Sequence, residues 1–175
     1  MASSDAPALM TAANATTLRH TRDGRGQLRI TRREPTVEWR RSRVKRGMQP
    51  REPDVHLEFD NDEAAPRLAR QALSSIFTGP DDPIADAVTL TASELVSNVV
   101  RHTSSSGVMQ AWDPKPDVPL RLEVEDHERA VPVIDGAPDV GGFGLSIVEK
   151  VADAWGVDPT TEGKVVWAEF NRPIV

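Results

Sequence analysis

The stretch SELVSNVVRH, Ser93–His102, lies in the middle of an apolar run and carries three polar side chains at helical spacing. Glu94 and Asn98 are four residues apart and Arg101 follows three residues later, so on a helix the three lie along one line of its surface. They form either a solvated polar stripe or a group directed at one ligand. This helix alone does not distinguish the two, and the rest of the chain has to be considered.

The apolar residues around this stretch predict a helix over about 84–103 that packs one face into a core. They recur at spacings of three and four, and they are Ile84, Val88, Ala92, Leu95, Val96 and Val99. The long loop 127–144 precedes a further predicted helix. Its apolar residues, also at near-helical spacing, are Leu145, Val148, Ala152 and Trp155.

The remaining segments predict strands and one more helix. Residues 55–59 alternate between apolar and polar side chains, as a half-buried strand does. EAAPRLARQALSSIF, 63–77, predicts a helix, whereas VMQAW, LRLEVED and KVVWAEF predict strands. The order β-α-α-β-β-loop-α-β-β predicts an α+β fold. We expect a two-layer sandwich in which about three helices cover one face of a mixed or antiparallel sheet.

Charge divides the chain into two parts. Residues 1–51 hold 12 Lys/Arg and 4 Asp/Glu, a net charge of +8, whereas residues 52–175 hold 9 and 23, a net charge of −14. We expect residues 1–51 to be a disordered, basic extension and residues 52–175 to be the folded domain. An over-extended start is an interpretation that stays open, with Met48, which opens the acidic part, as the start of translation. A nucleic-acid-binding arm is the other interpretation, but Trp39 is its only aromatic residue.

Composition excludes several classes of protein. The chain has no cysteine, which rules out disulfides, thiolate zinc sites and cysteine nucleophiles. No apolar run approaches the roughly 18 residues that a membrane-spanning helix needs. The N-terminal sequence lacks the charged and apolar regions of a secretory signal. We therefore expect a cytoplasmic protein.

Two further segments are candidates for a binding site. Asp126 ends a predicted strand, where its carboxylate is either a turn residue or an acceptor at the mouth of a pocket. GGFG, Gly141–Gly144, directly precedes a helix, so its backbone amides can approach an anion near the positive end of the helix dipole. The segment lacks the Lys-Ser/Thr pair of a P-loop.

Together these segments follow the order of the conserved boxes of the GHKL (Bergerat) ATP-binding fold, shared by DNA gyrase B subunits and histidine kinases. LTASELVSNVVRH, VEDHE, GGFGLSIVEKVADAWGV and EGKVVWAEF resemble the small actinobacterial ATP-binding proteins related to anti-sigma-factor serine/threonine kinases. The resemblance covers roughly residues 54–172. It implies ATP and Mg²⁺ as ligands and a protein serine as the phosphate acceptor.

The resemblance also implies roles for individual residues. Asn98 matches the family's magnesium ligand, and Glu94 matches the general base. Asp126 matches the carboxylate that accepts a hydrogen bond from the adenine amino group. Arg101 is a further candidate for contact with the phosphates. The lid corresponds to residues 128–141, and its junction with the next helix corresponds to Gly142, Gly144 and Leu145.

Two residues depart from the family pattern, both on the adenine side. Glu128 stands where relatives have a small residue, two positions after the aspartate. Val165 stands where relatives have a threonine whose hydroxyl supports that aspartate. The loss of one buried hydrogen-bond partner costs roughly 1–3 kcal/mol.

Several functions therefore stay open. The first hypothesis is an ATP-binding regulator that holds a sigma factor or phosphorylates an anti-anti-sigma antagonist, with a homodimer as a possible assembly. The alternative is a non-catalytic binding module that sequesters a protein partner. A histidine kinase core is poorly supported, because neither His20 nor His56 opens a long helical hairpin. DNA binding would involve only the basic arm, with an affinity that depends on salt.

Overall fold

The computed structural model describes residues 17–22, 28–33, 52–79, 81–113, 118–128 and 143–173. In this part of the chain one sheet of seven strands has the order β2-β1-β6-β7-β5-β4-β3, and every neighbouring pair is antiparallel. The bounds are β1 Thr17–Arg22, β2 Leu28–Arg33, β3 Val55–Phe59, β4 Gly107–Trp112, β5 Leu120–Asp126, β6 Ala154–Pro159 and β7 Lys164–Phe170.

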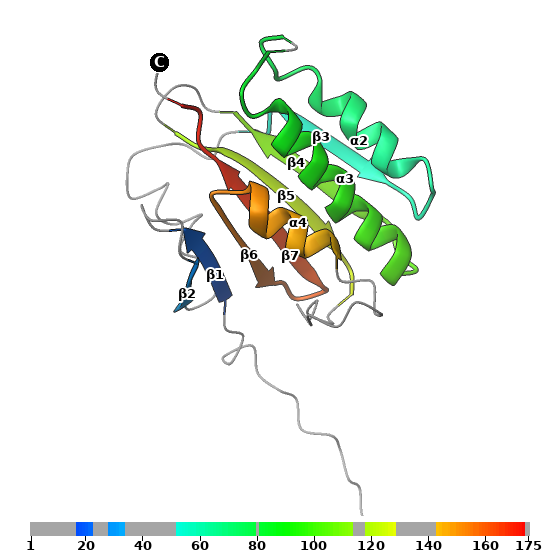
Figure 1. Ribbon diagram of the computed structural model, residues 1–175. Helices are drawn as coiled ribbons and strands as arrows, with labels where there is room; N and C mark the ends of the chain where they lie inside the picture. The colour runs from blue at the N-terminus through cyan, green and yellow to red at the C-terminus, as the bar shows by residue number, and fades with distance from the viewer. Residues whose placement is uncertain are drawn as a thin grey trace, which may run out of the picture.

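Three helices lie on the same face of this sheet (Figure 1). They are α2 (Ala65–Leu73), α3 (Ala85–His102) and α4 (Phe143–Val151). The predicted α+β two-layer sandwich is confirmed, and the elements from β3 to β7 follow the predicted order. Within the described residues, no helix is both long enough and apolar enough to cross a membrane.

The core lies between the sheet and the helices. Alternation in the strands sends every second side chain into it, for example Leu120, Leu122 and Val124 of β5. The helix α3 contributes the apolar stripe expected from its sequence. Its residues in the core cluster are Val88, Ala92, Leu95, Val96 and Val99. This packing fixes which side of α3 remains for Glu94 and Asn98.

Trp155 does not lie on the last helix, as its spacing had predicted. The helix α4 ends at Val151, and Trp155 belongs to β6, where it pairs with Ala168 of β7. The prediction was wrong because Trp155 is buried in the same core from a strand, and one buried aromatic residue fits either period. β6 and β7 form an antiparallel hairpin after α4.

The strands β1 and β2 fall within the segment expected to be a disordered extension. β1 pairs with β2 on one side and with β6 on the other, so the hairpin continues the sheet at this edge. Strand pairing relies on backbone hydrogen bonds, which the arginine-rich composition of the segment does not reveal.

A partly buried ion-pair cluster connects the segment just before α3 to Arg172, which follows β7. Arg172 Nη2 donates to Asp82 Oδ2 at 3.2 Å, and Arg172 Nη1 donates to Asp113. Asp82 Oδ1 accepts from the backbone N–H of Ile84 at 3.2 Å, just before α3 begins. Burial acts to raise the pKa of Asp82, but hydrogen bonds from Ile84, Arg172 and Thr78 outweigh it and hold this pKa below its ordinary value.

Candidate functional site

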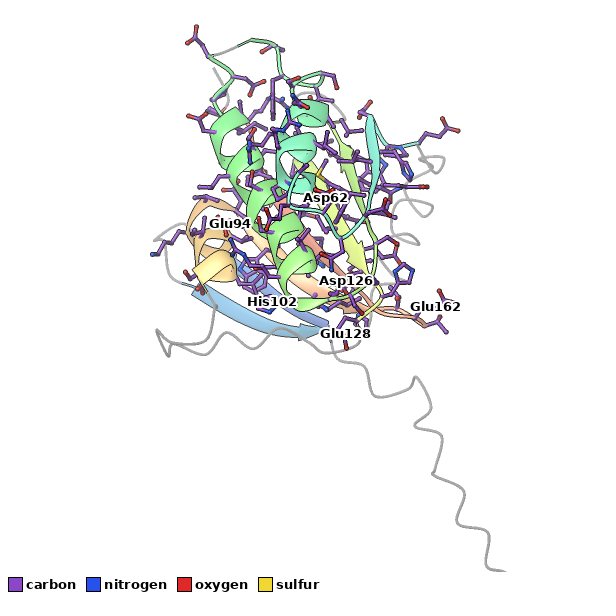
Figure 2. All side chains as sticks on the ribbon, turned by 90° about the vertical axis from the view of Figure 1, so that its right-hand side faces the viewer. Asp62, Glu94, His102, Asp126, Glu128 and Glu162 are labelled. Atoms are coloured by element: carbon purple, nitrogen blue, oxygen red, sulfur yellow. The ribbon has the colours of Figure 1, made fainter. Side chains whose placement is uncertain are left out.

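The side chains of Glu94 and Asn98 meet the first turn of α4 at Gly144. A methyl group placed on Gly144 would lie 2.9 Å from Asn98 Nδ2, 3.1 Å from Asn98 Oδ1 and 3.1 Å from Glu94 Oε2. Only a residue without a side chain leaves both polar groups in place. Both are half-buried on α3, and Figure 2 shows Glu94 on the side of α3 that faces α4. The two segments joined here are far apart in the sequence.

Asp126 is buried at the end of β5, on the helix-covered side of the sheet. It is 5% exposed, and its Oδ1 accepts hydrogen bonds from Lys164 Nζ and from the backbone N–H of Glu128, each at 2.9 Å. Lys164 Nζ also donates to the backbone carbonyl of Glu128 at 2.8 Å. Among the described residues no donor reaches Oδ2. Asp126 is therefore held in one orientation with one carboxylate oxygen left to accept from a ligand.

Close backbone packing fixes the position of Asp126. A methyl group on Gly163, just before β7, would lie 1.9 Å from the backbone carbonyl oxygen of Asp126 and 2.7 Å from the Cα of His127. In β4, Gly107 pairs with Asp126 and leaves room for the ring of Phe59. One glycine in β4 and one directly before β7 thus let the backbone pack closely on both sides of Asp126.

Hydrogen bonds hold the loop after α3, residues 103–106, close to the end of β5. Asn61 Nδ2 donates to the backbone carbonyl of Thr103, and Thr103 Oγ1 donates to the carbonyl of Val99 at 2.9 Å. His127 Nδ1 lies 3.3 Å from the carbonyl oxygen of Ser106. These contacts connect the C-terminal end of α3, which carries Asn98 one turn earlier, to the end of β5. Sequence reasoning did not identify Asn61 or Thr103 in this role.

The other candidate residues are placed as follows. Arg101 is exposed in the last turn of α3 and has no hydrogen bond or ion pair within the described part of the chain. Leu145 is 5% exposed and belongs to the core cluster, so it anchors α4. Gly142 and the lid, apart from Glu128, lie outside the described residues. Their expected roles stay predictions.

The two departures from the family pattern have different surroundings. The side chain of Glu128 is exposed, and the residue engages Asp126 and Lys164 through its backbone (Figure 2). Val165 is half-buried, and it points to the opposite face of the sheet from Asp126 because it neighbours the inward-facing Lys164.

Lys164 is the site residue that the sequence analysis did not single out. It is 6% exposed and pairs with Asp126 across the two strands. A signal was present in the sequence, because Lys164, Val166, Ala168 and Phe170 share one face of the strand. A lysine in a core-facing series needs a buried partner, and Asp126 supplies it.

The polar side chains of the site suit a metal ion that takes most of its oxygen ligands from a bound phosphate compound and from water. Within the described residues, no group of three or more His, Cys, Asp or Glu side chains is gathered so that it could hold a metal ion. Asn98 offers one amide oxygen, and magnesium commonly takes one or two protein ligands together with phosphates and waters. Asn98 would therefore hold Mg²⁺ jointly with the phosphates of a nucleotide, and Mg²⁺ would neutralise their charge.

Comparison with known proteins agrees with this geometry. The family model described as "Histidine kinase-like ATPase domain" matches residues 59–170, from the end of β3 to the end of β7. No curated protein matches the chain. The matched range contains Glu94, Asn98, Asp126 and Gly144, and an ATPase domain implies ATP binding. The chain belongs to the histidine kinase-like ATPase domain family.

Proposed function

We propose that this protein binds ATP with Mg²⁺ and transfers the γ-phosphoryl group to a serine of a partner protein, as its resemblance to anti-sigma-factor kinases implies. The observation that carries the proposal is the contact of Gly144 with both Glu94 and Asn98. A polar stripe that was merely solvated would not require a glycine of a second helix packed against it. The contact favours the interpretation in which these side chains share a ligand.

Each residue has one role in this proposal. Asn98 holds Mg²⁺, and the N-terminal end of α4 at Gly144 lies near the phosphates, where backbone amides favour anions. Asp126 Oδ2 accepts a hydrogen bond from the adenine amino group, while Lys164 keeps Asp126 Oδ1 occupied. Because a carboxylate accepts and does not donate, the pair favours adenine over guanine, whose corresponding group is a carbonyl.

Phosphotransfer would then proceed as a direct displacement. The serine oxygen of the partner attacks the γ-phosphorus, and the bond between this phosphorus and the bridging oxygen to the β-phosphate breaks, so that ADP leaves. The carboxylate of Glu94 accepts the proton of the serine hydroxyl. Glu94 is half-buried, which is consistent with access to an incoming substrate.

The partner class follows from the resemblance and from charge. Anti-sigma-factor kinases act on sigma factors and on small antagonist proteins, and we propose one of these as the partner. Residues 52–175 carry a net charge of −14, which favours association with a basic protein surface.

Labelled ATP, Mg²⁺ and candidate antagonist proteins test the kinase activity. Glu94→Gln should lower phosphotransfer by about 10²–10⁴-fold, the usual contribution of a general base, while ATP binding stays intact. Glu149→Gln makes the same chemical change on α4 and serves as the control. Unchanged phosphotransfer in Glu94→Gln would rule out the role assigned to this carboxylate.

A non-catalytic binding module is the second candidate, and one observation favours it. Within the described residues, Asp126 accepts only from Lys164 and from the backbone N–H of Glu128, and no hydroxyl group supports it. Titration calorimetry with ATP and Mg²⁺ separates the two functions. Heat of binding without phosphotransfer to any candidate antagonist would support the module, and the absence of heat at millimolar nucleotide would exclude both nucleotide-dependent functions.

A further inference from the structure

The ion pair between Lys164 and Asp126 leaves two hydrogen-bonding positions open. Lys164 Nζ donates to Asp126 Oδ1 at 2.9 Å and to the backbone carbonyl of Glu128 at 2.8 Å. An ammonium group carries three N–H donors, so one N–H of Lys164 has no acceptor among the described residues. On the same carboxylate, Oδ2 has no donor in that part of the chain. The pair therefore has one donor and one acceptor still to be satisfied.

Burial makes these open positions costly. The side chains of Lys164 and Asp126 are only 8% and 6% exposed. A buried ion pair is favourable only when further hydrogen bonds satisfy the protons and lone pairs that the two partners do not satisfy for each other. A buried charged group that lacks a hydrogen bond is costlier than a neutral one. A ligand that offers an acceptor next to a donor would remove both costs together.

The surroundings of the pair suit a flat aromatic ligand. Asp126 and Lys164 are direct partners in the β5–β7 register, and the next pair on the same face of these strands is Val124 with Val166. Both valines are buried and belong to the core cluster between the sheet and the helices. Apolar side chains beside a few well-placed polar groups are typical of small-molecule sites, where the polar groups fix the orientation of the ligand.

Adenine presents the complementary groups along one edge. Its N6 amino group donates, and its ring nitrogen N1, bonded to the same carbon, accepts. Proteins commonly identify a base by hydrogen bonds to this edge. We propose that Lys164 Nζ donates its third N–H to adenine N1 while Asp126 Oδ2 accepts from N6, so that Lys164 is a specificity-determining residue. This inference rests on the proposed binding of ATP at Asp126.

The lysine adds a second point of discrimination to the one that Asp126 provides. Guanine has a carbonyl oxygen in place of the N6 amino group and an N–H in place of the N1 acceptor. In guanine an acceptor therefore faces Asp126 Oδ2 and a donor faces the Lys164 ammonium, and both contacts become unfavourable. Cytosine has the same edge as adenine, but the match to an ATPase domain favours adenine.

Nucleotide analogues test the contact in the unchanged protein. Calorimetry with Mg²⁺ compares ATP with 1-deaza-ATP, in which a C–H replaces N1, and with 7-deaza-ATP, which loses a ring nitrogen on the opposite side of the base. We expect 1-deaza-ATP to bind about 10–100-fold more weakly than ATP, the effect of losing one hydrogen bond to a charged group. The analogue 7-deaza-ATP should bind as ATP does. Equal affinities of ATP and 1-deaza-ATP, or equal losses with the two analogues, would overturn the proposal.

A variant assigns the contact to the lysine. Lys164→Met removes the donor, and Lys150→Met makes the same change at an exposed position of α4 as the control. ATP and 1-deaza-ATP should bind Lys164→Met with the same Kd, whereas Lys150→Met should keep the difference. A difference that persists in Lys164→Met would assign the contact with N1 to a water molecule or to another donor, and would overturn the role of Lys164.

Nitrogen-15 NMR of the lysine ammonium groups needs no variant that risks unfolding. The chain has only four lysines, so few signals have to be assigned. Saturating ATP should shift the Nζ signal of Lys164 further than saturating 1-deaza-ATP does. The same shift with both nucleotides would contradict a hydrogen bond to N1.

The outcomes separate this inference from the proposed function. Absence of ATP binding would overturn both. ATP binding without discrimination against 1-deaza-ATP would overturn only the role of Lys164. Discrimination without phosphotransfer to any candidate antagonist would support the role of Lys164 and count against the kinase activity.

Discussion

Replacing Gly144 with alanine tests whether α3 and α4 form one site. The added methyl group would lie 2.9 Å from Asn98 Nδ2 and 3.1 Å from Glu94 Oε2. Contacts this short force both side chains to move by a few tenths of an ångström. Since both atoms end flexible side chains, the fold can absorb the change, whereas the geometry of the site cannot.

The expected magnitudes separate stability from function. Alanine is favoured over glycine in a helix by up to about 1 kcal/mol. A side chain displaced from its rotamer costs about 0.5–1.5 kcal/mol. These contributions oppose each other, so the melting temperature should change by less than about 4 °C. A displacement near 1 Å in an active site costs about 10²-fold in rate, and the smaller shift here should cost at least about tenfold in phosphotransfer.

Calorimetry with ATP and Mg²⁺, phosphotransfer with labelled ATP, and thermal denaturation together measure these effects. Lys150→Ala, an exposed substitution on the same helix, is the control. If Gly144→Ala keeps normal nucleotide affinity and normal phosphotransfer while remaining folded, then Glu94 and Asn98 do not form the site at this junction. A large loss of stability would instead show that the clash is relieved by the backbone.

Three further predictions concern the rest of the domain. Gly163→Ala places a methyl group 1.9 Å from the Asp126 carbonyl oxygen, so urea denaturation should show a loss of about 3 kcal/mol or more; an unchanged midpoint would contradict this packing. Lys164→Met should cost about 3–5 kcal/mol, because it leaves the Asp126 carboxylate buried without its cation, and the added change Asp126→Asn should restore part of the loss in a double-mutant cycle. The pKa of Asp82 lies below its ordinary value of 3.8, so its contribution to stability is present above that pH and is lost as the pH falls through the folded-state pKa. Asp82→Asn should therefore weaken the dependence of the free energy of unfolding on pH below about pH 4. Denaturation at a series of pH values measures this dependence. An unaltered slope would show that Asp82 has no such role.

Much of the fold could be predicted because its signals are local. The alternation of β5 and the apolar stripe of α3 each report burial on one side of an element, and both predictions are confirmed. The candidate site could be inferred from the order of its motifs, with Glu94, Asn98 and Asp126 on separate elements. The structure adds that Gly144 contacts the first two of these residues.

What could not be predicted depends on contacts between distant segments. The ion pair between Asp82 and Arg172 joins residues 90 positions apart, and neither residue has a local pattern that identifies its partner. The same holds for Lys164, whose importance follows from its pairing with Asp126 on the neighbouring strand. Trp155 was misassigned because burial alone does not separate a strand from a helix when few residues carry the pattern.

The sheet order also determines when the proposed nucleotide site can form during synthesis. Asn98 and Asp126 leave the ribosome first, but Gly144 belongs to α4 and Lys164 begins β7, the strand that lies between β5 and β6. Asp126 therefore has no cation beside it, and β5 has no neighbour on that side, until the last part of the domain has been made. Translation at about 5–20 residues per second leaves this half-sheet exposed for a few seconds. A nascent chain cannot engage ATP through the complete site before β7 has inserted.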